Sequence, residues 1–172
     1  MIRVRPYRKN DASVIVNWCK DEDTFYKWSA GILGEYPITV ARMENATNGR
    51  IDNDHYFPFV AVDEGKVVGF FTLRIPNENE NEMRFGFVIV DPLLRGRGYG
   101  KKMLQSGLKF ATEVYGAEKI SLGVFDNNPG AYYCYKSVGF VETGETEMYP
   151  VRNEEWNCIV MEFIPDKRQS GN

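Results

Sequence analysis

The alternation of apolar and polar residues predicts a chain in which short strands and amphipathic helices follow one another. Short runs rich in apolar and β-branched residues, bounded by proline, glycine or charged turns, are typical of buried strands. Asp63-Glu64-Gly65 lies between two such runs and predicts a hairpin. The predicted strands are residues 2–5, 59–62, 66–75, 82–90, 119–125, 140–146 and 157–164.

Apolar residues three or four positions apart predict helices between these strands. A first helix follows Asn10 or Asp11, a second covers residues 24–30, and a third covers residues 100–115. The first is expected to place Val14, Ile15, Trp18 and Cys19 on one face, and in the third an apolar stripe is formed by Met103, Leu104, Leu108 and Ala111.

A short fourth helix is predicted from residues that are typical of helix starts and ends. Asn128 can cap it, Pro129 takes its first position and Gly139 lies beyond its end. Residues 32–57 are expected to be irregular or partly helical. The resulting order predicts an α/β sheet with mixed strand directions.

Length and charge narrow the class of protein. The 172 residues suit one domain, predicted over residues 1–165, with residues 166–172 as a disordered tail. The net charge of −3 argues against nucleic acid as a partner and favours a cationic or neutral substrate. No apolar run resembles a signal peptide or a membrane span, so we expect a cytoplasmic protein without a membrane partner.

Cysteine and histidine are too few and too scattered for a metal site. The three cysteines, Cys19, Cys134 and Cys158, form no CxxC pair, and His55 is the only histidine. A cysteine nucleophile would have to pair with His55, which lies in a polar stretch. We therefore expect no bound metal and interpret the thiols as buried small residues.

The segment 91–102 carries the strongest chemical signal. It is rich in glycine and joins a predicted strand to the third helix, where backbone N–H groups and the helix dipole favour an anion. Four cations crowd this helix start, Arg95, Arg97, Lys101 and Lys102. Without an anion they would oppose the dipole at a few tenths to about 1 kcal/mol each, so the segment predicts a pyrophosphate site.

Two common phosphate motifs do not fit this segment. A P-loop requires serine or threonine after Gly100-Lys101, and Lys102 stands there. A dinucleotide fingerprint requires GxGxxG, whereas here the glycines are Gly96, Gly98 and Gly100. A tight turn with solvated cations remains the structural alternative, and a nucleotide-binding protein the other functional one.

Two motifs resemble the signatures of the GNAT superfamily of acetyl-CoA-dependent N-acetyltransferases. Residues 95–100 resemble its Q/R-x-x-G-x-G/A signature, and residues 128–140 its N-x-x-A-x-x-x-Y-x-x-x-G-F signature. The two stand about thirty residues apart, with a helix and a strand between them, as in that family. The resemblance implies a GNAT-like fold, with a mixed, mostly antiparallel sheet of six to seven strands flanked by helices.

The resemblance also implies which residues bind acetyl-CoA. The backbone of the strand before the loop, Val88 and Val90 above all, would bind the pantetheine arm, and Asn128 would contact the arm from the other side. Asn128 would also serve as a helix cap. The implied cofactor-binding residues are Phe87, Val88, Ile89, Val90, Arg95, Gly96, Arg97, Gly98, Tyr99, Gly100, Lys101 and Asn128.

In the implied reaction an amine attacks the acetyl carbonyl, which a backbone amide near Val88 polarises. Tyr135 matches the tyrosine that protonates the leaving thiolate, although it could be a core tyrosine. Many relatives carry a glutamate as general base where this chain has Arg84. Glu82, two residues earlier on the same strand face, is the candidate base here, with ordered water or a neutral amine as alternatives.

The acceptor remains open at this stage. A small cationic amine, such as a polyamine or amino sugar, is slightly favoured over a protein N-terminus or lysine. A non-catalytic acyl-CoA-binding or sensing module is the rival function, and a homodimer is left open. Arg84 could orient an acidic group of the substrate or be a solvated cation. Four aromatic residues could form part of an acceptor pocket or lie in the core: Phe25, Tyr26, Trp28 and Tyr36. Five carboxylates near the last hairpin could attract an amine or simply be solvated: Glu142, Glu145, Glu147, Glu154 and Glu155.

Overall fold

Seven strands form one mixed sheet in the computed structural model, which describes residues 1–51 and 54–166. Their order is β1-β2-β3-β4-β5-β7-β6, with β4 and β5 parallel and all other neighbours antiparallel. The predicted fold class is confirmed, and most of the predicted tail, 167–172, lies outside the described residues. The strands are β1 Arg3–Pro6, β2 Tyr56–Asp63, β3 Lys66–Arg74, β4 Glu82–Val90, β5 Lys119–Phe125, β6 Val141–Val151 and β7 Glu154–Phe163.

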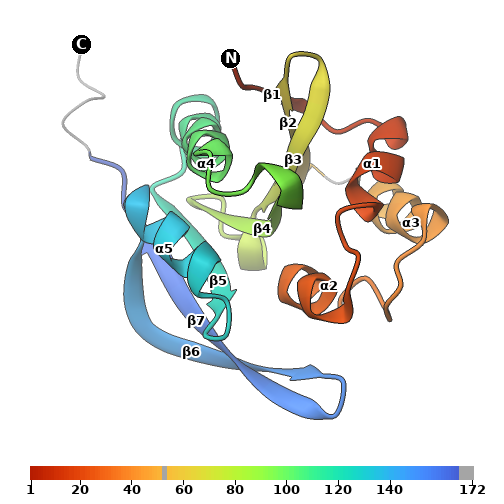
Figure 1. The fold of residues 1–172 in the computed structure, drawn as a ribbon. Coiled ribbons are helices and arrows are strands. Elements are labelled where there is room, and N and C mark those ends of the chain that lie inside the picture. The colour runs from red at the N-terminus through yellow and green to blue at the C-terminus, as the bar shows by residue number, and fades with distance from the viewer. Residues whose placement is uncertain (52–53, 167–172) are drawn as a thin grey trace.

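Helices cover both faces of the sheet (Figure 1). On one side lie α1 (Ala12–Val16), α2 (Glu22–Ser29) and α3 (Val40–Ile51). On the other lie α4 (Tyr99–Lys109) and α5 (Pro129–Ser137). Strand residues alternate between the two faces, so that neighbours such as Phe70 and Phe71 belong to different apolar clusters.

The helix ends follow from local hydrogen bonding. The Asp21 side chain accepts a hydrogen bond from the Thr24 backbone N–H at 2.7 Å and caps α2. The predicted apolar stripe of α4 is confirmed, because Met103, Leu104, Leu108 and Ala111 are all buried. The last of these lies in a π-helical turn, Phe110–Val114, that continues α4 to the end of the predicted helix.

The prediction for Val14 is wrong. The α1 helix has only five residues and follows a 3-10 turn, so Ala12 and Ile15 fix its buried face. Trp18 and Cys19 reach the core from the turn after the helix, whereas Val14 is 38% exposed. The periodicity that joined Val14 to the others assumed a longer helix than the chain forms.

The parallel pair β4–β5 separates after a short paired stretch. Only Glu82–Arg84 of β4 pair with Lys119–Ser121 of β5. Beyond these residues β4 continues to pair with β3, and β5 with β7. The facing edges of β4 and β5 are therefore free of each other over their carboxyl halves, which opens the sheet at its centre.

The β6–β7 hairpin is longer than predicted, and its far end reaches α2 (Figure 1). Arg152 in its turn donates a hydrogen bond to Glu22 Oε2 at 3.0 Å, and its guanidinium lies 5.0 Å from the ring centre of Tyr26. These contacts join the last hairpin to the N-terminal helices. They make the hairpin one wall of the opening at the sheet centre.

Candidate active site

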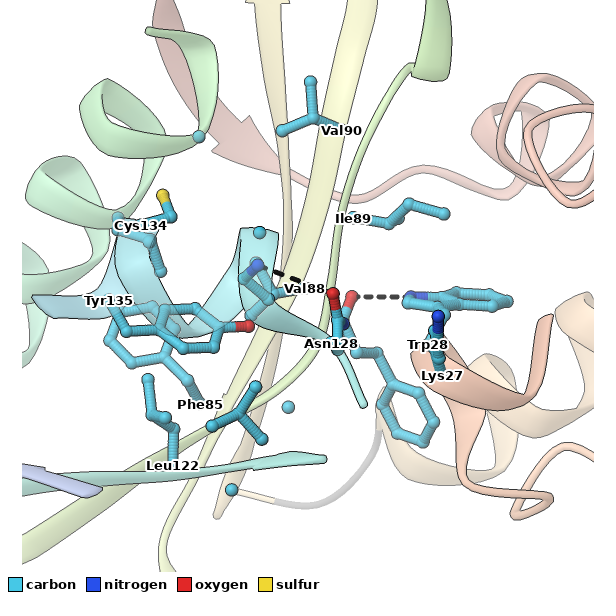
Figure 2. A pocket seen from close by; sticks show the side chains of 18 of the residues that line it. Lys27, Trp28, Phe85, Val88, Ile89, Val90, Leu122, Asn128, Cys134 and Tyr135 are labelled. Carbon is cyan, nitrogen blue, oxygen red and sulfur yellow. Dashed lines mark hydrogen bonds between the residues drawn. The ribbon is translucent and has the colours of Figure 1, made fainter. Parts of the chain in front are cut away.

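A cleft of about 1080 Å³ occupies the opening between β4 and β5. Residues of β4 run along it, while α4 and α5 bound it on one side and α2 on the other. Figure 2 shows Tyr135 and Cys134 of α5 facing Lys27 and Trp28 of α2 across the cleft. One end of the cleft lies at the glycine-rich loop and the other between β4 and the last hairpin.

The loop end combines left-handed glycines with a helix start. Gly96 and Gly98 have φ angles of 75° and 82°, which L side chains rarely adopt, and Gly98 immediately precedes α4. The first N–H groups of α4 lack partners within the helix and carry its positive dipole end. Arg95 and Lys101 line the cleft here, so this end is suited to a multiply charged anion.

A β-bulge distorts β4 at the middle of the cleft. Phe70 pairs with Ile89 and Thr72 with Gly86, so β4 has one residue more than β3 over this stretch. Phe87 takes a left-handed φ of 50°, which is costly for a residue with a side chain. The indole N–H of Trp28 donates a hydrogen bond to the Phe87 carbonyl at 2.8 Å (dashed in Figure 2).

Tyr135 projects from α5 towards the centre of the cleft, and its hydroxyl points away from the helix (Figure 2). Its side chain is otherwise buried against Phe140. Burial raises the pKa of this phenol above its ordinary value, so the hydroxyl remains protonated. No residue in the described part of the chain accepts its proton in a hydrogen bond.

Two cysteines also line the cleft, Cys134 and Cys158. Burial raises the pKa of both thiols, that of Cys158 to about 11, which disfavours a reactive thiolate. Cys19 and Cys158 are buried as predicted, whereas Cys134 is only half-buried. His55 is not among the cleft residues, which argues against a cysteine–histidine nucleophile.

Three cations and one carboxylate are among the described residues that line the other end of the cleft. Asp23 and Lys27 of α2 form an ion pair at 2.8 Å, so their charges offset each other. Arg74 of β3 and Arg84 of β4 also line this end and lie directly opposite each other in the sheet. The two ends differ in how the cations are presented, by a glycine-rich loop and a helix start at one end and by strand and helix side chains at the other.

Glu82, the candidate general base, does not line the cleft. It is the first residue of β4, where its side chain accepts a hydrogen bond from Ser121 Oγ at 2.8 Å and pairs with Lys119 Nζ at 3.2 Å. Its side chain is 16% exposed. The role of Glu82 stays a prediction, and its engagement with β5 argues against it.

The structure brings together most of the residues selected from the sequence. One cleft is lined by Tyr135, Asn128, the strand segment 87–90 and, of the loop residues 95–101, all except Arg97. Asn128 caps α5 through a weak hydrogen bond from the Ala131 N–H at 3.5 Å. Of the aromatic residues, Trp28 lines the cleft, whereas Phe25 and Tyr26 are buried and Tyr36 packs beside them.

Some cleft residues had no sequence assignment. Lys27 and Arg74 lie at the end of the cleft beside the last hairpin, and Gly123 of β5 lies beside Arg84. The strand pair predicted on either side of the turn at 76–81 is the one signal that could have placed Arg74 opposite Arg84. The contact of Trp28 with the bulge has no counterpart in the sequence pattern.

The described residues contain no cluster of histidine, cysteine and carboxylate side chains that could hold a metal ion. Among those residues there is likewise no helix with the length and hydropathy needed to cross a membrane.

Comparison with known proteins identifies the family. Residues 16–140 match the model of the acetyltransferase (GNAT) family. This region covers more than half of the chain and contains both the loop and α5. The protein therefore belongs to the GNAT family of acetyltransferases, which confirms the family predicted from the two motifs.

Individual relatives differ in the acceptor that their names give. The spermine/spermidine N(1)-acetyltransferase of Bacillus subtilis is 32% identical over 99 residues, 54% of this chain and 65% of that protein. An N-alpha-acetyltransferase of Sulfurisphaera tokodaii is 32% identical over 106 residues, 56% of this chain and 64% of that protein. The chain thus matches just under two thirds of the length of either relative.

A solved structure shares the whole fold. The spermidine N-acetyltransferase of Vibrio cholerae, in complex with CoA and spermine, superposes with a TM-score of 0.80. The match covers 95% of both chains at 22% identity, a level at which it shows the fold and not the substrate.

Proposed function

We propose that this protein transfers the acetyl group of acetyl-CoA to a primary amine. The observation that carries the proposal is one continuous cleft. It runs from the start of α4, along the half of β4 that does not pair with β5, to the hydroxyl of Tyr135. A long ligand with a diphosphate at one end and a thioester at the other has the chemistry that this cleft offers. The family and the relatives' names support the same reaction.

In this proposal the glycine-rich loop holds the diphosphate of acetyl-CoA. The N–H groups at the start of α4 and the side chains of Arg95 and Lys101 supply hydrogen bonds and positive charge. The pantetheine arm lies along the carboxyl half of β4 and pairs with backbone groups that β5 leaves free. Asn128 approaches the arm from the side of α5.

The acetyl carbonyl lies at the bulge. Because the C=O and N–H of a trans peptide point in opposite directions, the bond from Trp28 to the Phe87 carbonyl turns the Val88 N–H away from α2. We assign this N–H to the carbonyl oxygen of the thioester. There it stabilises the negative charge that develops when the carbonyl is attacked.

The reaction is a direct transfer. The lone pair of a neutral amine forms the new C–N bond, and the C–S bond breaks with its electrons moving to sulfur. Tyr135 donates its phenolic proton to the sulfur as the thiolate leaves. The proton that the amine nitrogen loses passes to water, and the phenolate of Tyr135 regains a proton from solvent through the open cleft. Glu82 has no part in this scheme.

Thiol release from acetyl-CoA in the presence of a panel of primary amines tests the proposal. Tyr135→Phe should lower kcat about 100-fold, the lower end of the range for general acid catalysis, and leave CoA affinity within about threefold. Tyr132→Phe, on the same helix but outside the cleft, is the matched control.

The rival function makes a different prediction. Arg84 stands where many relatives have a glutamate base, which favours a non-catalytic acyl-CoA sensor as the second candidate. Tight CoA binding without thiol release on any amine would support the sensor and refute the transferase. Failure to bind CoA at all would refute both.

A further inference from the structure

At the end of the cleft beside the last hairpin, where the proposed reaction places the acceptor, cations outnumber carboxylates among the described lining residues. Lys27 is paired with Asp23, the only carboxylate among the described residues that line the cleft. Arg74 and Arg84 add two further cations, and they face each other across antiparallel strands.

Arg84 is held in the cleft with most of its hydrogen-bonding capacity unused. Its side chain is 15% exposed and forms an ion pair with Glu147, whose Oε2 lies 3.7 Å from Arg84 Nη2, beyond hydrogen-bond distance. That oxygen already accepts a hydrogen bond from Tyr149 Oη at 3.0 Å. Within residues 1–51 and 54–166, the five donors of the guanidinium make no hydrogen bond to the protein.

A glycine on the neighbouring strand β5 leaves room for the Arg84 guanidinium, because it has no side chain. A Cβ atom at Gly123 would lie 3.0 Å from Arg84 Nη2. Arg84 itself pairs with Ser121, so its side chain extends two residues along β5, towards the level of Gly86 on β4. From that level, Val88 is two residues further along the strand, about 7 Å at the usual rise per residue.

We propose that the acceptor is an amine that also carries a carboxylate, and that Arg84 binds this carboxylate with Arg74 beside it. This inference rests on the proposed acetyl transfer and names the substrate class of the same site. A planar guanidinium with free donors can bind a carboxylate through two parallel hydrogen bonds. The spacing suits an amino acid or a short peptide, whose nitrogen would lie a few bonds from the carboxylate and reach the thioester at Val88.

The same charges disfavour a polyamine. A polycation would meet three cations, Lys27, Arg74 and Arg84, and among the described lining residues only Asp23 carries a negative charge. For an amino-acid-like acceptor the cations have a second effect. They disfavour the protonated form of the nearby amine and so increase the fraction of neutral nucleophile.

Paired acceptors test this proposal. Each amino acid of a panel is compared with the amine that lacks only its carboxylate, and spermidine is included. For the best amino acid, kcat/KM should exceed that of its paired amine by about tenfold or more, as expected for a charge-assisted hydrogen-bonded pair. Arg84→Met should bring the ratio close to one, and Arg84→Lys should give an intermediate ratio because it keeps the charge but not the fork.

Arg3→Gln, which removes an exposed cation on β1, is the matched control and should leave the ratio unchanged. Equal or better use of spermidine or the paired amines, with a ratio unaffected by Arg84→Met, would overturn the assignment. Calorimetric binding of the same panel to the CoA-loaded protein separates this outcome from failure of the proposed reaction. Arg84-dependent binding of carboxylates without turnover would keep the acceptor site and refute the transferase, whereas no such binding and no turnover would refute both.

Discussion

Trp28→Phe tests whether the indole positions the backbone of β4 for the reaction. The substitution keeps an aromatic ring among Phe25, Phe70 and Phe87 but removes the N–H that donates to the Phe87 carbonyl. Trp28 would then be a positioning residue. It acts on the thioester only through the direction of the Val88 amide.

The cost of the left-handed backbone at Phe87 and the stabilisation from the Trp28 hydrogen bond are similar in size. A left-handed φ at a residue such as Phe87 costs about 1–3 kcal/mol. The Trp28 hydrogen bond is part-buried, and leaving a buried carbonyl without a partner costs up to about 1–3 kcal/mol, so this bond is comparable in size to the strain at Phe87. Without it, Phe87 can relax and the Val88 N–H loses its direction.

We expect kcat of Trp28→Phe to fall about 10- to 100-fold, because loss of an oxyanion donor costs about 100- to 1000-fold and the amide is misdirected rather than deleted. The KM for acetyl-CoA should change less than about threefold, since the loop that holds the diphosphate is unaffected. Steady-state kinetics of thiol release measures both constants.

Trp156→Phe is the matched control for this substitution. Trp156 is also 8% exposed, and its indole N–H donates to Glu154 Oε2 at 3.0 Å in the last hairpin, away from the cleft lining. An unchanged kcat in folded Trp28→Phe would refute the positioning role. An equal fall in Trp156→Phe would attribute the loss to general destabilisation.

Three further predictions concern titration and packing. Burial raises the pKa of Tyr135 above 10.0, so kcat should show no loss from this group between pH 7 and 10; a midpoint below 10 that vanishes in Tyr135→Phe would contradict this. Burial opposes ionisation of Asp11, but hydrogen bonds from Arg5 and the Arg8 amide prevail and lower its pKa, so its stabilisation exists above pH 4 and is lost as pH falls through the lowered pKa. Asp11→Asn should therefore lower the free energy of unfolding at pH 7 by about 2–3 kcal/mol, with a smaller difference from the parent in acid; urea titrations at both pH values check this. Gly107→Ala should destabilise by about 1–3 kcal/mol because its Cβ would lie 2.7 Å from a phenylalanine ring, whereas Gly130→Ala, with open space around it, should be neutral or stabilising in thermal melts.

Sequence reasoning placed the elements best where burial is continuous. β5 has the predicted bounds because apolar side chains buried on both of its faces give a nearly unbroken signal. The burial of β4 is interrupted, and its predicted bounds follow from the polar turn before it and from Asp91-Pro92 after it. β6 is mostly exposed along its length, so its middle has the composition of a polar loop, and the predicted strand stopped at residue 146. An edge strand held mainly by backbone pairing leaves little trace in the hydrophobic pattern.

The candidate site also has parts that the sequence predicts and parts that it does not. The loop and Tyr135 are consecutive motifs whose residue types are fixed by their chemistry, and the structure brings them into one cleft. The Trp28–Phe87 bond joins residues 59 positions apart and depends on a bulge that no local pattern encodes. The pairing of Arg74 with Arg84 depends on strand register, which the turn between them decides.

The short pairing of β4 with β5 has a mechanical consequence. Within the sheet, strands β1–β4 and strands β5–β7 are joined through only three described residue pairs. The two halves of the sheet can therefore tilt relative to each other about this short β4–β5 contact. A ligand bound between β4 and β5 would bridge the two halves where the strands do not pair, and would reduce the motion of the whole sheet. Amide hydrogen exchange along the outer halves of both strands would report that stiffening directly.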